Sequence, residues 1–198
     1  QMLRTSFTVS VVPAHAVKSI VQLIEESREF GTVAYYRGHR RFEWELIPAV
    51  FRSTCKGDER SMLNDFRSRA PVRYANCPYE HDLCNWLSLA QHFGLPTRLL
   101  DWTLSPLVAA YFATEPHPND DQRAGAIWAL NATKLNRMAG KGPGIFCFSM
   151  SNEEVITLVR PAFDDAFISP EKVLAVSPTE RETRLFVQQS VFTIHGDG

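Results

Sequence analysis

The amino-acid sequence predicts a single α/β domain of the α+β type, in which helices come first along the chain and strands come last. The chain has 198 residues, 44% of them apolar, which is enough to build one compact core. No internal repeat and no long linker divides it, so residues 1–198 are expected to form one domain. Helical spacing dominates the first half, and β-branched or aromatic runs dominate the second. That order favours a layered sheet flanked by N-terminal helices over a regular βαβ repeat.

The first elements are expected to be a helix and a short strand. A helix should follow Pro13, because apolar residues recur at helical spacing over residues 17–24. Residues 32–37 are rich in β-branched and aromatic side chains and predict a strand that ends at Gly38. Arg37 is therefore expected at the end of a strand.

The middle and late parts of the chain predict three helices and a series of strands. Amphipathic helices are expected over residues 59–70 and 80–93. Residues 95–103 predict a buried strand that leads into a helix over 107–113, because Ser105 suits an N-cap and Pro106 suits the first helical position. The remainder predicts strands over 125–131, 145–149, 172–177 and 184–195.

Composition excludes several classes of protein. Basic and acidic residues nearly cancel, with 21 of one and 22 of the other, so a general nucleic-acid or membrane-surface binder is not expected. No apolar run approaches the length of roughly 20 residues that a membrane helix needs, so no membrane partner is expected. Four cysteines without a CxxC pair indicate reduced thiols and a cytoplasmic protein. No metal site is expected, and the standard hydrolase, kinase and dehydrogenase signatures are absent from the sequence.

Two short segments carry side chains suited to ligand chemistry. In Tyr36-Arg37-Gly38, an arginine fork at a strand end can hold phosphate or ribose oxygens, and glycine backbone can pair with a carboxamide. A solvated basic turn would explain the same residues. In the second segment, Asp101 lies at a strand end where clefts open, and Trp102 offers a stacking surface.

Two neighbours in the second segment, Arg98 and His92, allow two interpretations each. Arg98 and Asp101 are three residues apart, so on a strand they point to opposite faces and each needs its own partner. Arg98 suits either a ligand or an internal ion pair that fixes the sheet, and the ion pair is favoured. His92 suits either helix-end hydrogen bonding or a role in the site.

These segments and several others together resemble the FRG domain family. The matching segments, in the order and spacing of that family, are Tyr36-Arg37-Gly38, Trp44–Pro48 with Phe51-Arg52, Leu89–Thr103, the helix Ser105–Ala113, the strand Gly125–Leu130 and the tail Arg184–Phe192. The resemblance covers nearly the whole chain. The layout is also similar, more distantly, to arginine-type ADP-ribosyltransferases, which implies a split, mostly antiparallel sheet.

The second resemblance implies roles for named residues. Arg37 and Gly38 would hold NAD, Asp101-Trp102-Thr103 would correspond to a Ser-Thr-Ser-like motif, and Gln188 would stand where those enzymes carry a catalytic glutamate. Candidate catalytic residues are Arg37, Asp101, Gln188 and Glu182, and candidate ligand-binding residues are Tyr36, Arg37, Gly38, His92, Arg98, Trp102 and Thr103. A neutral amide cannot stabilise positive charge as a carboxylate does, so Glu182, Glu180, Glu171 and Asp101 remain alternatives for the acid.

The resemblances leave several functions open. In the first, the chain uses NAD as a substrate and transfers ADP-ribose to a protein or nucleic acid, as a bacterial toxin or phage-defence effector with an antitoxin or effector partner. In the second, the cleft binds a nucleotide, ADP-ribose or nucleic acid as a sensor without catalysis. A third is a protein-interaction module. Salt dependence would separate phosphate contacts from apolar docking.

Overall fold

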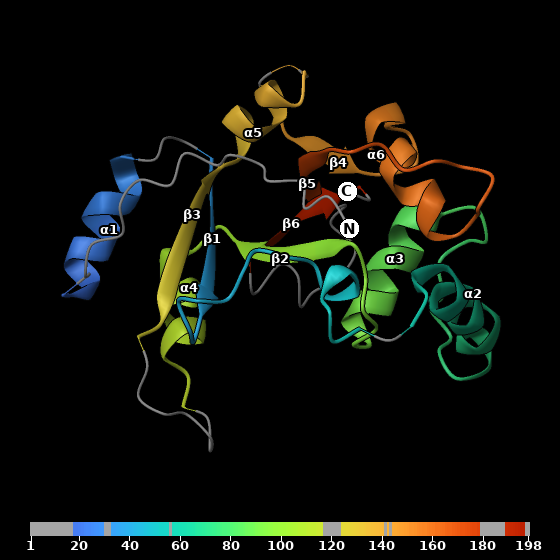
Figure 1. Ribbon diagram of the computed structural model, residues 1–198, viewed down its shortest axis with the longest axis horizontal. Coiled ribbons are helices and arrows are strands. Elements are labelled where there is room, and N and C mark those ends of the chain that lie inside the picture. Colours follow the sequence, from blue (N-terminus) through green and yellow to red (C-terminus); the bar gives the residue numbers. More distant parts are fainter. Residues whose placement is uncertain are drawn as a thin grey trace.

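The chain folds into one mixed sheet with helices at both ends and on both faces (Figure 1). The computed structural model describes residues 18–29, 33–55, 57–116, 124–140, 142, 144–178 and 189–196. Its strands are β1 Ala34–His39, β2 Leu99–Thr103, β3 Ala126–Asn131, β4 Phe146–Phe148, β5 Val173–Pro178 and β6 Ser190–His195. Its α-helices are α1 Ile20–Glu29, α2 Glu59–Arg69, α3 Leu83–His92, α4 Pro106–Thr114, α5 Ala132–Met138 and α6 Glu153–Val159. Its short 3-10 helices are Ala49–Phe51, Ala70–Val72 and Arg160–Ala162.

The sheet is mostly antiparallel. Its strand order is β3-β1-β2-β6-β5-β4. Every neighbouring pair is antiparallel except β4 and β5, which run parallel. The expected α+β domain with a mostly antiparallel sheet is therefore confirmed.

The sheet splits between β1 and β2. These strands share one register pair, Tyr36 with Thr103, whereas β1 pairs with β3 from Ala34 to His39 and β2 pairs with β6 along all of Leu99–Thr103. Figure 1 shows β2 turning away from β1 beyond this point. Arg37 and Asp101 lie just past the shared pair, on strands that have begun to separate.

Local sequence signals explain where the helices begin. Asp58 and Asp82 accept hydrogen bonds from Ser61 N and Asn85 N and so cap α2 and α3. The expected N-cap of α4 is confirmed, because the Ser105 hydroxyl accepts from Val108 N and Pro106 opens the helix. Two further helices were not expected. They are α5 and α6, each seven residues long, capped by Asn131 and Asn152.

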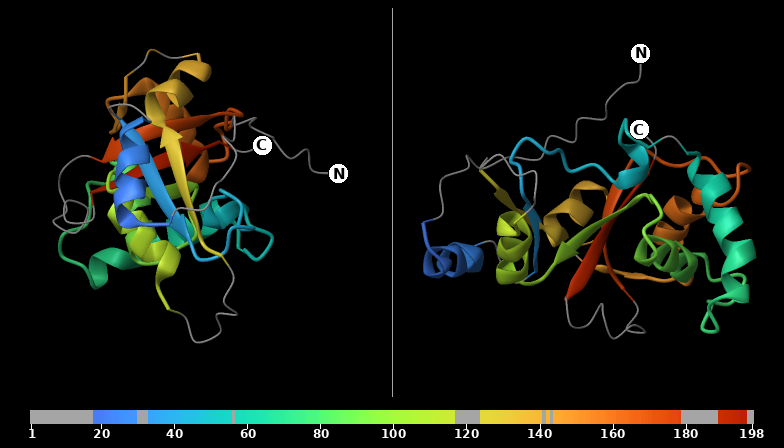
Figure 2. Two further views of the ribbon diagram at one scale, coloured as in Figure 1. Left: turned by 90° about the vertical axis from the view of Figure 1, so that its left-hand side faces the viewer. Right: turned by 90° about the horizontal axis from the view of Figure 1, so that it is seen from below.

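The core has a large part and two smaller ones. The largest cluster packs α2, α3 and α6 against one face of β2, β5 and β6, with Leu87, Leu158 and Leu174 fully buried. A second cluster, around Tyr35 and Trp102, lies where α5 covers the opposite face. The perpendicular views in Figure 2 place α1 and α4 at one end of the molecule and α2 and α6 at the other.

Helix α4 packs against β1 with almost no space between the backbones. A Cβ added at Gly38 would lie 1.9 Å from the carbonyl oxygen of Ala109 and 2.7 Å from the amide nitrogen of Ala113. Glycine is therefore required at residue 38 by the helix that covers it. The predicted role of the Gly38 backbone in ligand binding stays a prediction beside this packing role.

Two expectations fall partly outside the described residues. The first helix is observed from Ile20, while residues 1–17 are outside. The last strand is observed from Ser190, while 179–188 are outside. In the part of the chain that is described, no helix has the length and apolar character needed to cross a membrane.

Candidate functional site

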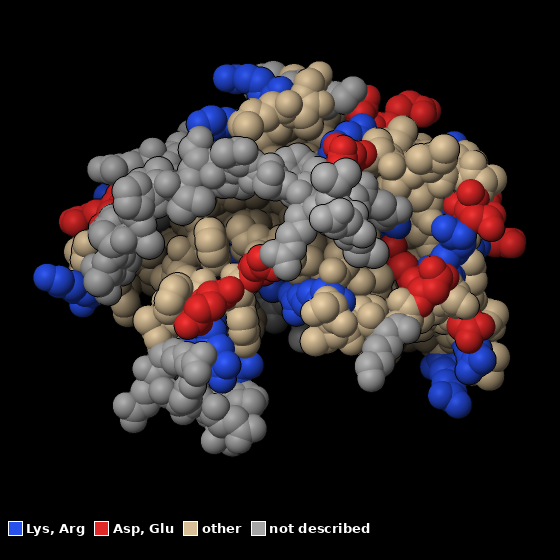
Figure 3. All heavy atoms as spheres, in the orientation of Figure 1, with Lys and Arg blue, Asp and Glu red and all other residues tan. Residues whose placement is uncertain are grey.

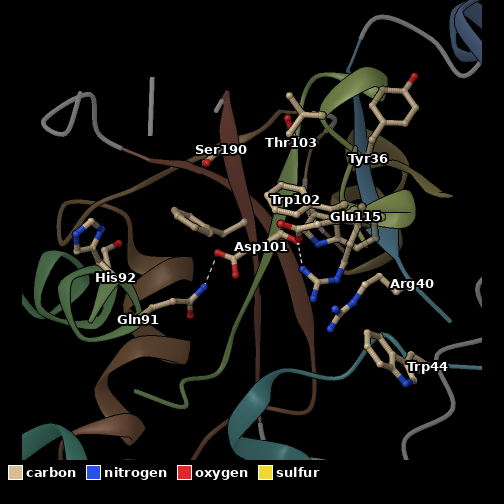
Figure 4. Close-up of a pocket in the computed structure, with 16 residues that line it drawn as sticks. Tyr36, Arg40, Trp44, Gln91, His92, Asp101, Trp102, Thr103, Glu115 and Ser190 are labelled. Atoms are coloured by element: carbon tan, nitrogen blue, oxygen red, sulfur yellow. Dashed lines mark hydrogen bonds between the residues drawn. The ribbon is translucent and has the colours of Figure 1, made fainter. Parts of the chain in front are cut away.

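A cleft opens where the sheet splits. It encloses about 500 Å³, within the range of small-molecule sites. Seven of the predicted site residues line it: Tyr36, Arg37, Gly38, His92, Asp101, Trp102 and Thr103. Figure 4 shows Gln91 on one side of Asp101 and Arg40 on the other. Arg37 and Asp101 thus line one cleft, while Gln188, the candidate from the tail, lies outside the described residues.

The Arg37 guanidinium bridges the two separating strands. Its Nη1 donates to the main-chain carbonyl of Asp101 at 2.6 Å, and its Nε donates to His39 Nε2 at 2.9 Å. The first bond joins β1 to β2 just past their last ladder pair. These two anchors fix the plane of the guanidinium, and the side chain of Arg37 lines the cleft.

His39 is held as a neutral imidazole. The Nε of Arg37 can only donate, so Nε2 of His39 accepts, and the ring proton lies on Nδ1, 3.2 Å from the carbonyl of Trp44. Burial lowers the pKa of His39 to about 4, and the positive charge of Arg37 acts in the same direction. His39 therefore serves Arg37 as an acceptor throughout the neutral range.

The Asp101 carboxylate is held from the opposite side of the cleft. Gln91 Nε2 donates to Asp101 Oδ1 at 2.6 Å, and the hydroxyl of Thr97 donates to Gln91 Oε1. Solvent reaches the carboxylate from the mouth of the cleft, but protein surrounds its other sides, and this burial raises its pKa. Arg37, the Gln91 bond and Arg52 each act to lower that pKa.

The cation and the carboxylate thus face one cleft without forming a direct pair. Arg37 binds the main-chain oxygen of Asp101, while the side-chain oxygen is bound by Gln91. Burial lowers the pKa of Arg37, and the charge of Asp101 opposes that change. Each charged group keeps hydrogen-bonding capacity that a ligand can use.

Aromatic side chains form the rim. Trp44 and Phe112 are 44% and 42% exposed although both are large and apolar. The Arg40 guanidinium lies over the Trp44 ring at 5.7 Å from its centroid. Glu115, at the end of α4, adds a second carboxylate and accepts from Tyr111 at 3.3 Å. These surfaces suit a ligand with flat rings as well as charge.

Comparison with known proteins now identifies part of the chain. Residues 32–122 match the family model of the FRG domain. This match makes part of the chain, 91 of its 198 residues, similar to FRG domains. Searches of curated proteins and of solved structures returned no significant match. The matched stretch supplies β1, α3, β2 and α4 to the cleft, while β6, which contributes Ser190 and Phe192, lies beyond it.

Arg98 lies in the core and not in the cleft. Its Nε and Nη2 donate to Glu59 Oε2 at 2.9 and 2.6 Å, and its Nη1 donates to Leu158 O and Ser169 Oγ. Both members of the ion pair are buried. The internal ion pair is the observed role, and the structure does not bring Arg98 to the ligand-binding group in which it was placed from the sequence.

Three other predicted residues lie at different depths. Trp102 touches the cleft but is buried, and its indole N–H donates to Thr193 Oγ1 at 3.0 Å, so it packs more than it stacks. His92 is exposed on the cleft wall, with its ring edge-on to Phe93. Glu171 is exposed and does not line the cleft.

The remaining acid candidates of the tail cannot be placed. Gln188, Glu182 and Glu180 lie outside the described residues. Within the described ranges, no group of three or more His, Cys, Asp or Glu side chains is arranged to hold a metal ion. The acids that the structure does place in the cleft are Asp101 and Glu115.

Sequence reasoning missed Gln91 and Glu115. Gln91 stands in the last turn of α3, and its role depends on a turn that returns the chain beside it. A polar residue on the otherwise apolar stripe of α3 was the available signal. Glu115 follows α4 as its C-cap, a position where a carboxylate meets the negative end of the helix dipole. A carboxylate at this unfavourable position indicates that Glu115 has a role other than stabilising the helix.

Proposed function

We propose that the cleft binds NAD and that the domain cleaves it, in the manner of an ADP-ribosyltransferase that passes ADP-ribose to a macromolecular acceptor. One observation carries the proposal. A guanidinium and a carboxylate line the same cleft, and each is held by another partner. NAD offers a matching pair of groups, an anionic diphosphate and a cationic nicotinamide ring. The site therefore suits a ligand that carries both signs of charge.

Arg37 is the proposed anchor for the diphosphate. Two anchors already fix its orientation, so little side-chain entropy is lost when a ligand binds. Arg40 stands beside it at the cleft wall and adds a second positive charge. The exposed faces of Trp44 and Phe112 suit the adenine or nicotinamide ring.

Asp101 is the proposed catalytic carboxylate. Cleavage breaks the bond between the ribose C1′ and the nicotinamide nitrogen, the bonding electrons leave with nicotinamide, and positive charge develops on the ribose. A nucleophile on the acceptor then bonds to C1′ and loses its proton to solvent. A carboxylate in a partly desolvated cleft stabilises the developing charge more strongly than one in water.

Binding without cleavage is the second candidate. It is favoured by one observation from the sequence, the amide Gln188 where the related enzymes carry glutamate. In this case Arg37 and the aromatic rim bind ADP-ribose or another nucleotide, and Asp101 accepts hydroxyl hydrogen bonds from it. The two candidates predict the same binding site and differ in turnover.

The test combines binding and turnover. NAD and ADP-ribose are titrated calorimetrically into the wild type, and nicotinamide release is assayed in the same samples. Asp101→Asn keeps an acceptor for Gln91, so we expect NAD binding to persist while release falls by roughly a hundredfold or more. Arg37→Lys loses the bidentate fork, and we expect affinity to fall by roughly tenfold or more.

A matched control removes an arginine elsewhere. Arg69→Gln breaks an exposed ion pair with Asp65 on α2, away from the cleft, and we expect it to behave as the wild type. Binding without release in the wild type would support the sensor. Absence of any NAD or ADP-ribose binding would refute the NAD-cleaving enzyme and the ADP-ribose sensor.

A further inference from the structure

We infer that Gln91, oriented by Thr97, is the positioning residue that fixes the Asp101 carboxylate in the cleft. The inference deepens the proposed function and rests on it for its catalytic consequence. Its geometric content concerns three side chains that the structure places in contact: Thr97 hydroxyl, Gln91 amide and Asp101 carboxylate.

The chemistry of these three side chains fixes which group donates and which accepts in each hydrogen bond. An ionised carboxylate only accepts hydrogen bonds, so the amide of Gln91 must present its nitrogen to Asp101. Its oxygen then faces Thr97, and because that oxygen only accepts, the hydroxyl must donate. Thr97 therefore selects one of the two orientations of the amide. The opposite orientation would place the amide oxygen against the carboxylate.

Thr97 is itself held rigidly. It is 1% exposed, and its hydroxyl accepts a hydrogen bond from the amide of Leu99 at 3.3 Å while it donates to Gln91. It does not line the cleft, so any effect of Thr97 on a ligand must pass through another residue. Its distance from solvent excludes a direct contact with substrate.

The turn after α3 brings these three side chains together. Gly94 ends the helix with φ of +85°, the left-handed region that glycine adopts readily. The amide of Leu95 bonds back to Ala90 O, and that of Gly94 to Gln91 O. Residue 97 is thereby returned beside residue 91, and β2 then carries Asp101 past the same point. Three polar residues spread over eleven positions meet because of this one turn.

The consequence concerns both the charge and the direction of the carboxylate. The bond from Gln91 stabilises the ionised form, against the burial that favours the neutral form. The same bond holds Oδ1 and so fixes the direction of the carboxyl group in the cleft. Arg37 and Arg52 are the charged groups that act on this carboxylate, and neither is altered by a change at Thr97.

Two variants and a rescue test the inference. Thr97→Val keeps the shape of the side chain and removes the donor, and Gln91→Leu removes the amide. We expect the pKa of Asp101, followed by carbon-13 NMR of its carboxyl, to rise in both variants. Thr97→Ser retains the hydroxyl and should titrate as the wild type. Thr157→Val, which removes an exposed hydroxyl on α6, is the control.

Kinetics add a second measurement. We expect the NAD-cleavage kcat to fall roughly tenfold or more in Thr97→Val and Gln91→Leu, as for one lost hydrogen bond to a charged group. The KM should change little because Arg37 is untouched, and the acid limb of the kcat profile should move to higher pH. Should Thr97→Val fail to fold, Gln91→Leu, which changes a partly exposed residue, carries the test.

The outcomes separate the two proposals. An Asp101 pKa that is unchanged in both Thr97→Val and Gln91→Leu would overturn the positioning role, whatever the activity. The expected pKa shifts in a protein that does not cleave NAD would support the positioning role and refute the catalytic proposal. A kcat that is unchanged while the pKa rises would overturn the catalytic consequence of the inference.

Discussion

Removing the charge of Glu59 should destabilise the fold strongly. Glu59→Gln is nearly the same shape, but it removes the negative charge that faces the buried Arg98 guanidinium. Arg98 is 3% exposed and Glu59 is 8% exposed, so water cannot replace the lost partner. Removing one member of a buried ion pair typically costs about 3–5 kcal/mol. Because both side chains are buried, solvent does not screen their charges, and the full range applies.

The other contacts of Arg98 decide where in this range the loss of stability falls. Its Nη1 bonds to Leu158 O and Ser169 Oγ survive the substitution, and a glutamine oxygen can still accept one of the lost bonds. The ring of Phe51 also remains, 5.9 Å from the guanidinium carbon. We therefore expect the lower end, about 3 kcal/mol, which for a chain of this size lowers Tm by about 6–12 °C.

Urea unfolding at neutral pH, followed by circular dichroism, measures this loss. The double variant Glu59→Leu/Arg98→Met removes both charges, and we expect it to recover much of the stability that the single variant loses. A Glu59→Gln protein within 1 kcal/mol of the wild type would refute the argument. So would a normal stability combined with lost NAD affinity, because that result would place Arg98 in ligand binding after all.

Three further predictions concern Gly38 and His39 of β1 and the N-cap of α4. Gly38→Ala should cost at least about 2 kcal/mol in urea unfolding, because its Cβ would meet the backbone of α4 at 1.9 Å. Acid should also destabilise the fold: the pKa of His39 is about 4 in the folded chain and 6.5 unfolded, so the unfolded chain binds the proton first. This contribution, about 3 kcal/mol, is present above pH 6.5 and lost between pH 6.5 and 4, and His39→Gln should lack that part of the pH dependence. Ser105→Ala should cost about 1 kcal/mol in thermal unfolding by removing the N-cap of α4, and Ser105→Asp should restore it.

The sequence predicted elements best where the signals were local. The cap and proline at Ser105-Pro106 located α4, and the apolar stripe located α3. The helices α5 and α6 are too short to show a periodic stripe, and only their asparagine caps mark them. Burial of these helices by tertiary contacts, and not local propensity, explains why they form.

The site was predicted only in part, for a different reason. Arg37 and Asp101 were expected at strand ends, but they lie inside β1 and β2. That these two strands are neighbours, and separate after one register pair, depends on pairing between distant segments. On the face shown in Figure 3, the acidic and basic side chains of the described residues are interspersed. Charge alone therefore does not mark the cleft on this face. The partner of Arg98 lies 39 residues away on α2, which no spacing rule connects to it. The ion pair was favoured from the sequence, but its partner could not be named, so Arg98 stayed among the candidate ligand-binding residues.

The strand order has a consequence for how this protein can be divided. The matched stretch, residues 32–122, contains β1 and β2, but their outer neighbours β3 and β6 come from later in the chain. A fragment cut at residue 122 would carry two strands that share one register pair and expose a long unpaired edge on each side. The stretch by which the family is recognised is thus not a unit that can be excised and expected to fold. Residues 32–122 need β3 and β6, the strands that pair with β1 and β2.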